Sequence, residues 1–230
     1  MTSVTFGIPS YNNNYYCLET VRTIVKAMKK FKKISFEIIV IDDGSTDNTY
    51  NRINNFKKLK RVKFLKIFKN NKNLGFARSC LKAAKLGNGK YFKIIHSGNI
   101  ESVIDLRKYF INFGKHKIIL SFMKDNRFFF RKFLSLLCTF VFRFVSGVNI
   151  KYFQSAILCL RVDFIKYFPK NYGNFFVSSL IVNILYKNKK FIEFEIKPIF
   201  KKGSTAVSFQ NLISFIKSIF SIIYLRVKYN

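Results

Sequence analysis

Three carboxylates crowd one short segment of this chain, although its 230 residues include only 11 Asp and Glu. Asp42, Asp43 and Asp47 follow residues 36–41 (FEIIVI), a nearly continuous apolar run that is rich in β-branched residues. Carboxylates at the end of a strand can accept hydrogen bonds from a ribose or a base edge, or can hold a cation that neutralises a diphosphate. Alternatively, residues 43–47 form a turn that caps the next helix. The placement of the three acids favours a binding site.

Two further polar segments follow apolar runs in the same way. Residues 10–12 come after the run 4–8, and residues 96–99 come after the run 91–95. In the parallel sheets of α/β proteins, ligands bind beyond the carboxyl ends of the strands. We therefore expect these two segments and residues 42–45 to converge on one site.

Apolar periodicity predicts the elements that carry these segments. Continuous apolar runs are typical of parallel strands buried on both faces, whereas apolar residues at intervals of three and four indicate helices. The two patterns alternate, which predicts an α/β fold: a mostly parallel, doubly wound sheet with helices on both faces. The predicted strands cover residues 4–8, 36–41, 62–68, 91–95 and 117–122, and the predicted helices cover residues 18–28, 75–86, 104–113 and a segment that begins at Thr46 or Asp47.

Two apolar segments of the second half carry cations within or beside them. Residues 133–142 (FLSLLCTFVF) contain no charge but are shorter than the roughly 20 residues that span a bilayer. Residues 212–225 are similarly apolar, with Lys217 inside. We predict that both form amphipathic helices on a membrane surface, the first within an interfacial segment of residues 126–148. The alternative is that their aromatic side chains belong to the core.

The composition fits one folded domain with a short appendage. Apolar residues make up 49% of the chain, enough to form a core. We place a main domain at residues 1–205 and a C-terminal amphipathic helix at residues 206–230. The four Cys show no CxxC spacing and no companion histidines, which argues against a zinc site or a disulfide framework. No segment resembles a signal peptide, so we expect a cytoplasmic protein.

The net charge is strongly positive, because 42 Lys and Arg against 11 Asp and Glu give a formal +31. Such a chain attracts anions, and charge alone does not select among phosphates, nucleic acid and acidic lipid headgroups. The excess of Lys, together with that of Asn, Ile and Phe, is also typical of the codon usage of an AT-rich genome. On that interpretation, part of the positive charge carries no function. The cationic residues form no recognisable nucleic-acid module, so we expect no nucleic-acid partner.

Four motifs occur at the spacing of a known family. They are residues 8–13 (IPSYNN), 39–49 (IVIDDGSTDNT), 71–79 (NKNLGFARS) and 87–99 (GNGKYFKIIHSGN). On these motifs the chain resembles family 2 glycosyltransferases, especially the branch that transfers sugars to polyprenyl phosphates. The resemblance implies the nucleotide-sugar-binding GT-A-type fold. Two later segments look like further landmarks of that branch: residues 149–156 (NIKYFQSA) and 196–205 (IKPIFKKGST).

The resemblance also implies a nucleotide diphosphate sugar donor, held by the loop after the first strand and by the DDGS segment. Asp42 and Asp43 would contact the base or the ribose, and both are expected to lie in a loop and not in the core. A basic pair beside a glycine suits phosphate, although in so basic a chain it can also be a solvated loop. The implied nucleotide-sugar-binding residues are Pro9, Tyr11, Asn12, Asp42, Asp43, Gly44, Ser45, Gly75 and Arg78, and the implied phosphate-binding residues are Lys201, Lys202 and Ser204.

One position departs from the family pattern. Where the family has an Asp that binds a metal after the fourth strand, this chain has residues 96–99 (HSGN). Mg²⁺ or Mn²⁺ is still the expected cofactor, with Asn99 and Glu101 as candidate oxygen ligands, although an amide is a weaker ligand than a carboxylate. His96 is a candidate ligand or proton carrier, or an ordinary loop histidine. The sequence assigns no catalytic base.

Together these features predict a glycosyltransferase that moves a sugar from a nucleotide diphosphate sugar to a polyprenyl phosphate, or to another membrane-associated glycan or lipid, by inverting displacement. A phosphate acceptor is already anionic and needs no general base. The alternative is a catalytically degenerate member that binds a nucleotide sugar or a partner protein without turnover, since the metal-site Asp is absent. We expect peripheral attachment to the anionic inner face of the cell membrane.

Overall fold

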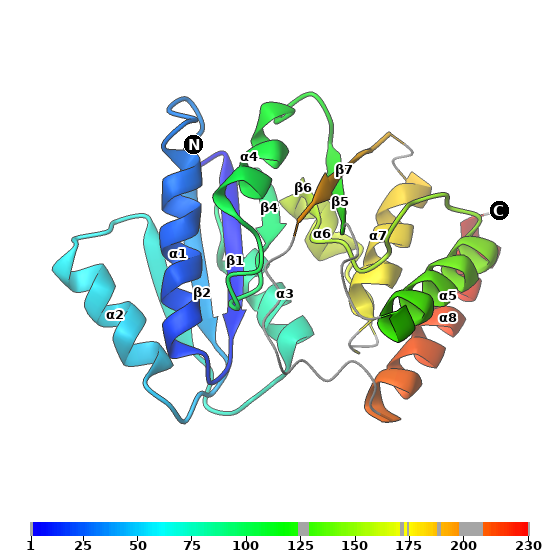
Figure 1. The fold of residues 1–230 in the computed structure, drawn as a ribbon, viewed down its shortest axis with the longest axis horizontal. Coiled ribbons are helices and arrows are strands. Elements are labelled where there is room, and N and C mark those ends of the chain that lie inside the picture. Colours follow the sequence, from blue (N-terminus) through cyan, green and yellow to red (C-terminus); the bar gives the residue numbers. More distant parts are fainter. Residues whose placement is uncertain are drawn as a thin grey trace.

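A seven-stranded sheet runs through the protein, and helices cover both of its faces (Figure 1). The computed structural model describes residues 2–123, 129–170, 173, 175–187, 190–197 and 209–229. The strand order is β3-β2-β1-β4-β6-β5-β7, and β6 alone of these seven runs antiparallel to its neighbours. The strands are β1 (Val4–Ser10), β2 (Phe36–Asp42), β3 (Leu65–Lys69), β4 (Tyr91–Ile94), β5 (Ile118–Met123), β6 (Leu158–Leu160) and β7 (Ile192–Ile196). The helices are α1 (Asn14–Met28), α2 (Thr49–Leu59), α3 (Phe76–Leu86), α4 (Val103–Ile111), α5 (Phe129–Ser146), α6 (Arg161–Lys166), α7 (Phe176–Lys187) and α8 (Phe209–Tyr229).

The sheet is buried on both faces because its central strands are apolar at nearly every position. In β2, Ile39 and Ile41 join the core on one face, whereas Ile38 and Val40 join the core on the other, and all four are fully buried. Helices α3, α6 and α7 pack on the first face, and α1, α2 and α4 pack on the second. The predicted mostly parallel α/β sheet is therefore confirmed.

The chain changes direction across the sheet between β1 and β4. Strands β1 to β3 extend to one edge, and β4 then pairs with the free side of β1. Ligands of such sheets bind at this switch point, beyond the carboxyl ends of the two strands. Here the loops after β1 and β4 meet, since Asn13 Nδ2 donates to Ser97 Oγ at 3.0 Å. The predicted convergence of residues 10–12 with residues 96–99 is correct.

Several predicted boundaries are wrong by a few residues; α1, for example, begins at Asn14 rather than Leu18. Two of the differences have a clear cause. Strand β3 begins at Leu65 rather than Val62, because Val62 still belongs to the turn that ends α2 and donates its N–H to the Lys57 carbonyl oxygen. Helix α2 begins at Thr49 rather than at Thr46 or Asp47, because the Asp47 carboxylate accepts hydrogen bonds from the N–H and the hydroxyl of Thr49 and so stays in the loop.

Three short elements of the second half were not predicted from the sequence. Strand β6 has three residues, too few for a periodic signal, and lies between β4 and β5. Helix α6 has only six residues. Strand β7 (IEFEI) alternates apolar with acidic residues, as expected of a half-buried strand at the edge of a sheet. Local patterns therefore predict the first half of the chain better than the second.

Helices α5 and α8 lie side by side, next to α7 and far from α2 (Figure 1). Their inner sides join the core: Phe142 is 1% exposed, and its ring centroid lies 5.1 Å from that of Phe215. Arg226 Nη1 donates to the carbonyl oxygens of Phe144 and Val145, at 2.9 and 3.1 Å. These contacts hold the two helices against each other.

The outer sides of α5 and α8 expose apolar side chains. The most exposed aromatic rings are those of Phe140, Phe144 and Phe220, at 67%, 77% and 66%. Within the described parts of the chain, no helix combines the length and apolarity needed to cross a membrane. Both helices are thus amphipathic. The exposed apolar residues are Phe133, Leu136, Leu137, Phe140 and Phe144 on α5, and Leu212, Ile213, Ile216, Phe220, Ile223, Tyr224 and Val227 on α8.

Helix α8 belongs to the core of the main domain, because Ile222 is fully buried in the same cluster as Phe142. The predicted boundary between residues 205 and 206 lies outside the described residues. So do residues 126–128, the start of the predicted interfacial segment, whose remainder is occupied by α5 and the turn after it. The division into two units stays a prediction.

The buried and exposed phenylalanines of α5 allow a paired stability test. We expect Phe142→Ala to lower the free energy of unfolding by about 3–5 kcal/mol, because it leaves a cavity among three other aromatic rings. Phe140→Ala should change it by less than about 0.5 kcal/mol. Urea denaturation followed by circular dichroism measures both values. Equal losses would show that protein covers both sides of α5.

Candidate functional site

Hydrogen bonds join the loops that follow β1 and β2. Asn12 has a left-handed backbone, with a φ of 46°, and its Oδ1 accepts the Thr46 N–H at 2.9 Å. The Asn12 N–H in turn donates to Ser45 Oγ at 3.0 Å, and the Asn13 N–H donates to Thr49 Oγ1 at 3.0 Å. Asn12 and Ser45 therefore shape the site by holding its loops together. Their contact with a nucleotide stays a prediction.

Asp43 connects the end of β2 to the start of α3. Its carboxylate is 3% exposed and accepts three hydrogen bonds. On Oδ1 it accepts Asn70 Nδ2 at 2.7 Å and the Leu74 N–H at 3.0 Å, and on Oδ2 it accepts the Gly75 N–H at 2.9 Å. Hydrogen bonds to an ionised acceptor are among the stronger ones in proteins, so this contact fixes the position of the loop before α3.

Asp42 is fully buried at the last position of β2. Its Oδ1 accepts the Ser45 N–H at 3.3 Å, whereas its Oδ2 has no hydrogen-bond partner among the described residues. The hydroxyl of Ser10, the residue paired with Asp42 in the sheet, is also buried and interacts with the thiol of Cys17, a buried residue of α1. Buried polar groups are normally paired, so Asp42 Oδ2 is a candidate acceptor for a ligand group.

The expectation that Asp42 and Asp43 lie in a loop and not in the core is only partly correct, because Asp43 does lie in the loop after β2 but both residues are buried. Strand β2 extends through Asp42, and the segment 70–75 encloses Asp43. Asp42 and Asp43 directly follow the apolar residues of β2, so the elements that cover this strand also cover the two acids.

Glycines allow the loops to approach each other. Gly44 has a φ of 75°, and a Cβ at this position would lie 2.5 Å from the backbone carbonyl carbon of Lys72. Gly75 has a φ of 90° at the position before α3. Residues with a Cβ rarely adopt such backbone conformations, so both predicted residues contribute through their backbone.

Two adjacent cavities open at the switch point. The first, of about 220 Å³, lies at the ends of β1, β2 and β4, and the predicted residues Pro9, Tyr11 and Asp43 line it. The second, of about 430 Å³, lies between the start of α3 and α7. Phe76 and His96 line both cavities, and their rings stack with centroids 4.8 Å apart and an interplanar angle of 4°.

His96 lines both cavities and is exposed there, with its ring stacked on Phe76. The partial loss of surrounding water, together with the nearby Lys93 ammonium, lowers its pKa. The imidazole is therefore neutral at neutral pH. It can form hydrogen bonds to a ligand but contributes no positive charge to the site.

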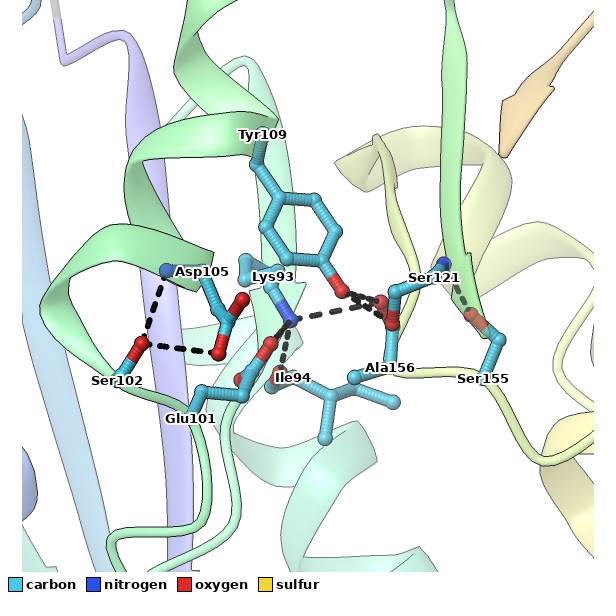
Figure 2. Close-up of polar contacts among 9 residues, drawn as sticks. All are labelled: Lys93, Ile94, Glu101, Ser102, Asp105, Tyr109, Ser121, Ser155 and Ala156. Atoms are coloured by element: carbon cyan, nitrogen blue, oxygen red, sulfur yellow. Dashed lines mark hydrogen bonds and ion pairs between the residues drawn. The ribbon is translucent and has the colours of Figure 1, made fainter. Parts of the chain in front are cut away.

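A buried ion pair lies beneath these cavities (Figure 2). Lys93 of β4 is fully buried, and its Nζ lies 3.1 and 3.2 Å from the two carboxylate oxygens of Glu101. The ammonium also donates to the carbonyl oxygens of Ile94 and Ala156, at 3.1 and 3.4 Å. Burial lowers the pKa of Lys93, and the charge of Glu101 opposes that shift.

Tyr109 of α4 completes this cluster. Its ring centroid lies 4.0 Å from Lys93 Nζ, and its hydroxyl is hydrogen-bonded to Ser121 Oγ at 2.7 Å and to the Ala156 carbonyl oxygen at 2.8 Å. Ser155 Oγ accepts the Ser121 N–H at 2.7 Å. Figure 2 shows how these groups join β4, α4 and β5 to the segment that lines the second cavity. The cluster therefore sets the shape of that cavity.

The candidate metal ligands are engaged within the protein. Glu101 is 8% exposed and paired with Lys93, and Asn99 Oδ1 accepts the Thr23 hydroxyl at 2.9 Å. Across the described residues, no three His, Cys, Asp or Glu side chains lie close enough together to hold a metal ion. The assignment of Asn99 and Glu101 stays a prediction, and their contacts do not favour it.

The remaining predicted residues do not line the first cavity. Arg78 is exposed on α3 and lines a third cavity, between α3, α7 and α8. Lys201, Lys202 and Ser204 lie outside the described residues. Their proposed contact with phosphate is untested.

Sequence reasoning missed several residues of the site. Asn70 binds the carboxylate of Asp43, and Gln154 lines the second cavity and donates to Ser178 Oγ at 2.9 Å. In a chain rich in Asn, nothing in the sequence separates Asn70 from its neighbours. The sequence does indicate a buried charged group at Lys93, because a lysine inside an apolar strand (YFKII) requires a buried partner.

One family model matches a part of the first half of the chain. Residues 5–97 match the model described as "Glycosyl transferase family 2". The match supports a family 2 glycosyltransferase. The family 2 region spans β1 to β4 and contains Asp42, Asp43 and Gly75. No curated protein matches the sequence.

Solved structures share the fold of the family 2 region and of the segments after it. Glucosyl-3-phosphoglycerate synthase from Mycobacterium tuberculosis, in complex with Mn²⁺, UDP-glucose and phosphoglyceric acid, gives a TM-score of 0.69 at 11% identity, over 99% of this chain and 80% of that chain. A mannosyltransferase from Pyrobaculum calidifontis, in complex with GDP-Man and Mn²⁺, gives a TM-score of 0.64 at 14% identity, over 98% of this chain and 70% of that chain. The chain therefore has a GT-A fold, as the resemblance implied.

Asp43→Asn tests the contact between β2 and α3. The substituted side chain places an NH₂ group, which only donates, where Asp43 accepts hydrogen bonds from neighbouring N–H groups. We therefore expect the free energy of unfolding to fall by about 1–3 kcal/mol. Amide hydrogen exchange at Leu74 and Gly75 should become faster. Asp47→Asn is the matched control, because Asp47 is exposed and its amide oxygen can still accept from Thr49. Unchanged exchange at both amides would contradict the role given to Asp43.

Proposed function

We propose that this protein is a glycosyltransferase that moves a sugar from a nucleotide diphosphate sugar to a polyprenyl phosphate, or to another membrane-associated glycan or lipid. One observation carries the proposal: the first cavity lies at the switch point of the sheet, and Pro9, Tyr11 and Asp43 of the family 2 region line it. Asp42 Oδ2, buried at the end of β2 and without a partner among the described residues, is a further candidate acceptor for an N–H of a base or a ribose hydroxyl.

The first cavity suits the nucleotide part of the donor. Tyr11 is 47% exposed at its edge and offers an aromatic surface for a base, and Pro9 forms part of the wall. The two solved neighbours bind UDP-glucose and GDP-Man, which supports a nucleotide diphosphate sugar as the donor class here.

The second cavity is suited to the reacting sugar. In an inverting displacement, an acceptor oxygen attacks the anomeric carbon, and the nucleoside diphosphate leaves with the electron pair of the broken bond. The described residues that line this cavity include no carboxylate, and His96 is neutral. This lining favours a phosphate acceptor, whose oxygen is already anionic and needs no general base.

Both solved neighbours hold Mn²⁺, which supports Mg²⁺ or Mn²⁺ as a cofactor of the donor. When bound, such an ion neutralises charge on the diphosphate. The residues after β4 fit it poorly, because Glu101 supplies the only carboxylate of residues 96–101 and is paired with Lys93. Lys201, Lys202 and Ser204 are our candidates for stabilising the leaving diphosphate.

The exposed faces of α5 and α8 support an acceptor held in a membrane. The two helices lie side by side and contain no Asp or Glu, whereas Arg143, Lys217, Arg226 and Lys228 supply positive charge. Apolar side chains on such a face insert at the boundary of headgroups and acyl chains, and each nearby cation adds about 1 kcal/mol on an anionic surface. We propose that the protein is cytoplasmic and binds peripherally to the inner face of the cell membrane.

Donor binding and turnover test the proposed activity. Calorimetric titration with UDP-glucose and GDP-mannose, with and without Mn²⁺, should show binding of at least one donor. Asp42→Asn should weaken that binding about tenfold or more, because it removes a buried charged acceptor. Asp47→Asn should leave it nearly unchanged. Transfer to a short isoprenyl phosphate is followed by chromatography of the product.

The results separate the two candidate functions. Donor binding without transfer or hydrolysis would favour the alternative, a degenerate protein that binds a nucleotide sugar or a partner protein. The absence of a metal-site Asp motivates that alternative. If no nucleotide sugar binds, the glycosyltransferase proposal is wrong.

Flotation with liposomes that contain anionic lipid tests the membrane proposal. Wild-type protein should float at low salt and bind less at high salt, because salt screens the cationic contribution. The double variant Phe140→Ser, Phe220→Ser should lose most of its binding. Leu59→Ser with Ile104→Ser is the matched control, since these exposed apolar residues lie on other helices. Wild-type protein that stays in the soluble fraction would make a soluble acceptor the better hypothesis.

A further inference from the structure

A third cavity, of about 610 Å³, lies between α3, α7 and α8. It shares Leu74, Gly173 and Phe176 with the second cavity, so the two are adjacent. The three cavities therefore follow one another from the ends of β1 and β4 to the surface of α8. A ligand in the third cavity would lie next to one in the second.

The charged residues around the third cavity are all cationic. Arg78, Lys170 and Lys217 line it, and none of its described lining residues is Asp or Glu. The three residues are exposed, so their charges face the cavity without the cost of burial. Guanidinium and ammonium groups together favour phosphate oxygens. The lining therefore points to a phosphate-bearing ligand.

Serine hydroxyls form much of the remaining wall. Ser179 of α7 lines the cavity together with Ser214, Ser218 and Ser221 of α8, and the hydroxyl oxygens of Ser179 and Ser218 lie 2.8 Å apart. Ser218 Oγ also donates to the carbonyl oxygen of Phe175 at 3.3 Å, so the hydroxyls of Ser179 and Ser218 hold α7 and α8 together at the cavity wall. A Cβ at Gly173 would lie 2.8 Å from Ser214 Oγ, so the glycine allows the chain to pass close to α8.

Lys217 stands at the border between this cavity and the exposed apolar face of α8. It shares the cavity side of the helix with Ser214 and Ser221, which lie three residues before it and four after it. Ile213, four residues before Lys217, and Phe220, three after, are its neighbours on the helix surface and are 38% and 66% exposed. A ligand with its phosphate in the cavity can place an apolar chain along this face.

We propose that the third cavity binds the phosphate monoester head of a lipid acceptor. Arg78, Lys170 and Lys217 contact the phosphate, and the hydrocarbon chain lies on the exposed face of α8. The inference deepens the proposed glycosyltransferase function and rests on it for the identity of the ligand as an acceptor. The phosphate oxygen then reaches the sugar across the boundary that the second and third cavities share at Phe176.

Calorimetric titration with farnesyl phosphate, without vesicles, tests the site. Wild-type protein should bind farnesyl phosphate about tenfold or more tightly than farnesol, and the variant Lys170→Gln, Lys217→Gln should lose about tenfold or more of that affinity. The control Lys58→Gln, Lys60→Gln removes the same charge from exposed positions at the end of α2 and should keep the wild-type affinity. UDP-glucose and GDP-mannose binding is measured on every variant as a separate readout.

Three results would overturn the proposal. They are an unchanged affinity in the Lys170, Lys217 variant, equal binding of farnesol and farnesyl phosphate, and binding of 3-phosphoglycerate as tight as that of farnesyl phosphate. The last would show that the ligand is a soluble phosphate and not a lipid. Lysine-dependent farnesyl phosphate binding in a protein that binds no nucleotide sugar would support this site and contradict the glycosyltransferase function.

Discussion

The candidate site depends on the buried carboxylate of Asp43. A charge in this position is tolerated only when hydrogen bonds replace the water it has lost. Asn70, Leu74 and Gly75 supply those bonds, so the loop before α3 cannot move away without leaving the charge unpaired. The same loop carries Phe76 to the stack with His96 that separates the two cavities. The carboxylate of Asp43 thus fixes the position of the loop that lines the site.

A second buried charge, of opposite sign, fixes the other side. Lys93 is neutralised by Glu101 and held by the carbonyl oxygen of Ala156, and Tyr109 covers it. Its positive charge helps to keep the imidazole of His96 neutral. The position at which the family pattern places a metal-binding Asp therefore has an internal cation beneath it.

The sequence predicts the first half of the fold because its apolar runs are long and regular, as in β2. It predicts the segments that form the site for the same reason, since the ends of parallel strands must meet at one edge. It cannot predict the burial of Asp43 or the pairing of Lys93 with Glu101, because both result from loops that fold back on strands and leave no periodic trace. Acids are usually exposed, which made the burial of Asp42 unexpected.

The row of cavities has ends of different character. One end opens beside Tyr11, whereas the other reaches Lys217 and the apolar side of α8. If a soluble donor enters at the first end and a lipid at the second, neither blocks the path of the other, and the two can bind in either order. The supply of lipid would then be set by its density in the plane of the bilayer. An apparent KM for that substrate would therefore describe membrane composition as much as it describes the protein.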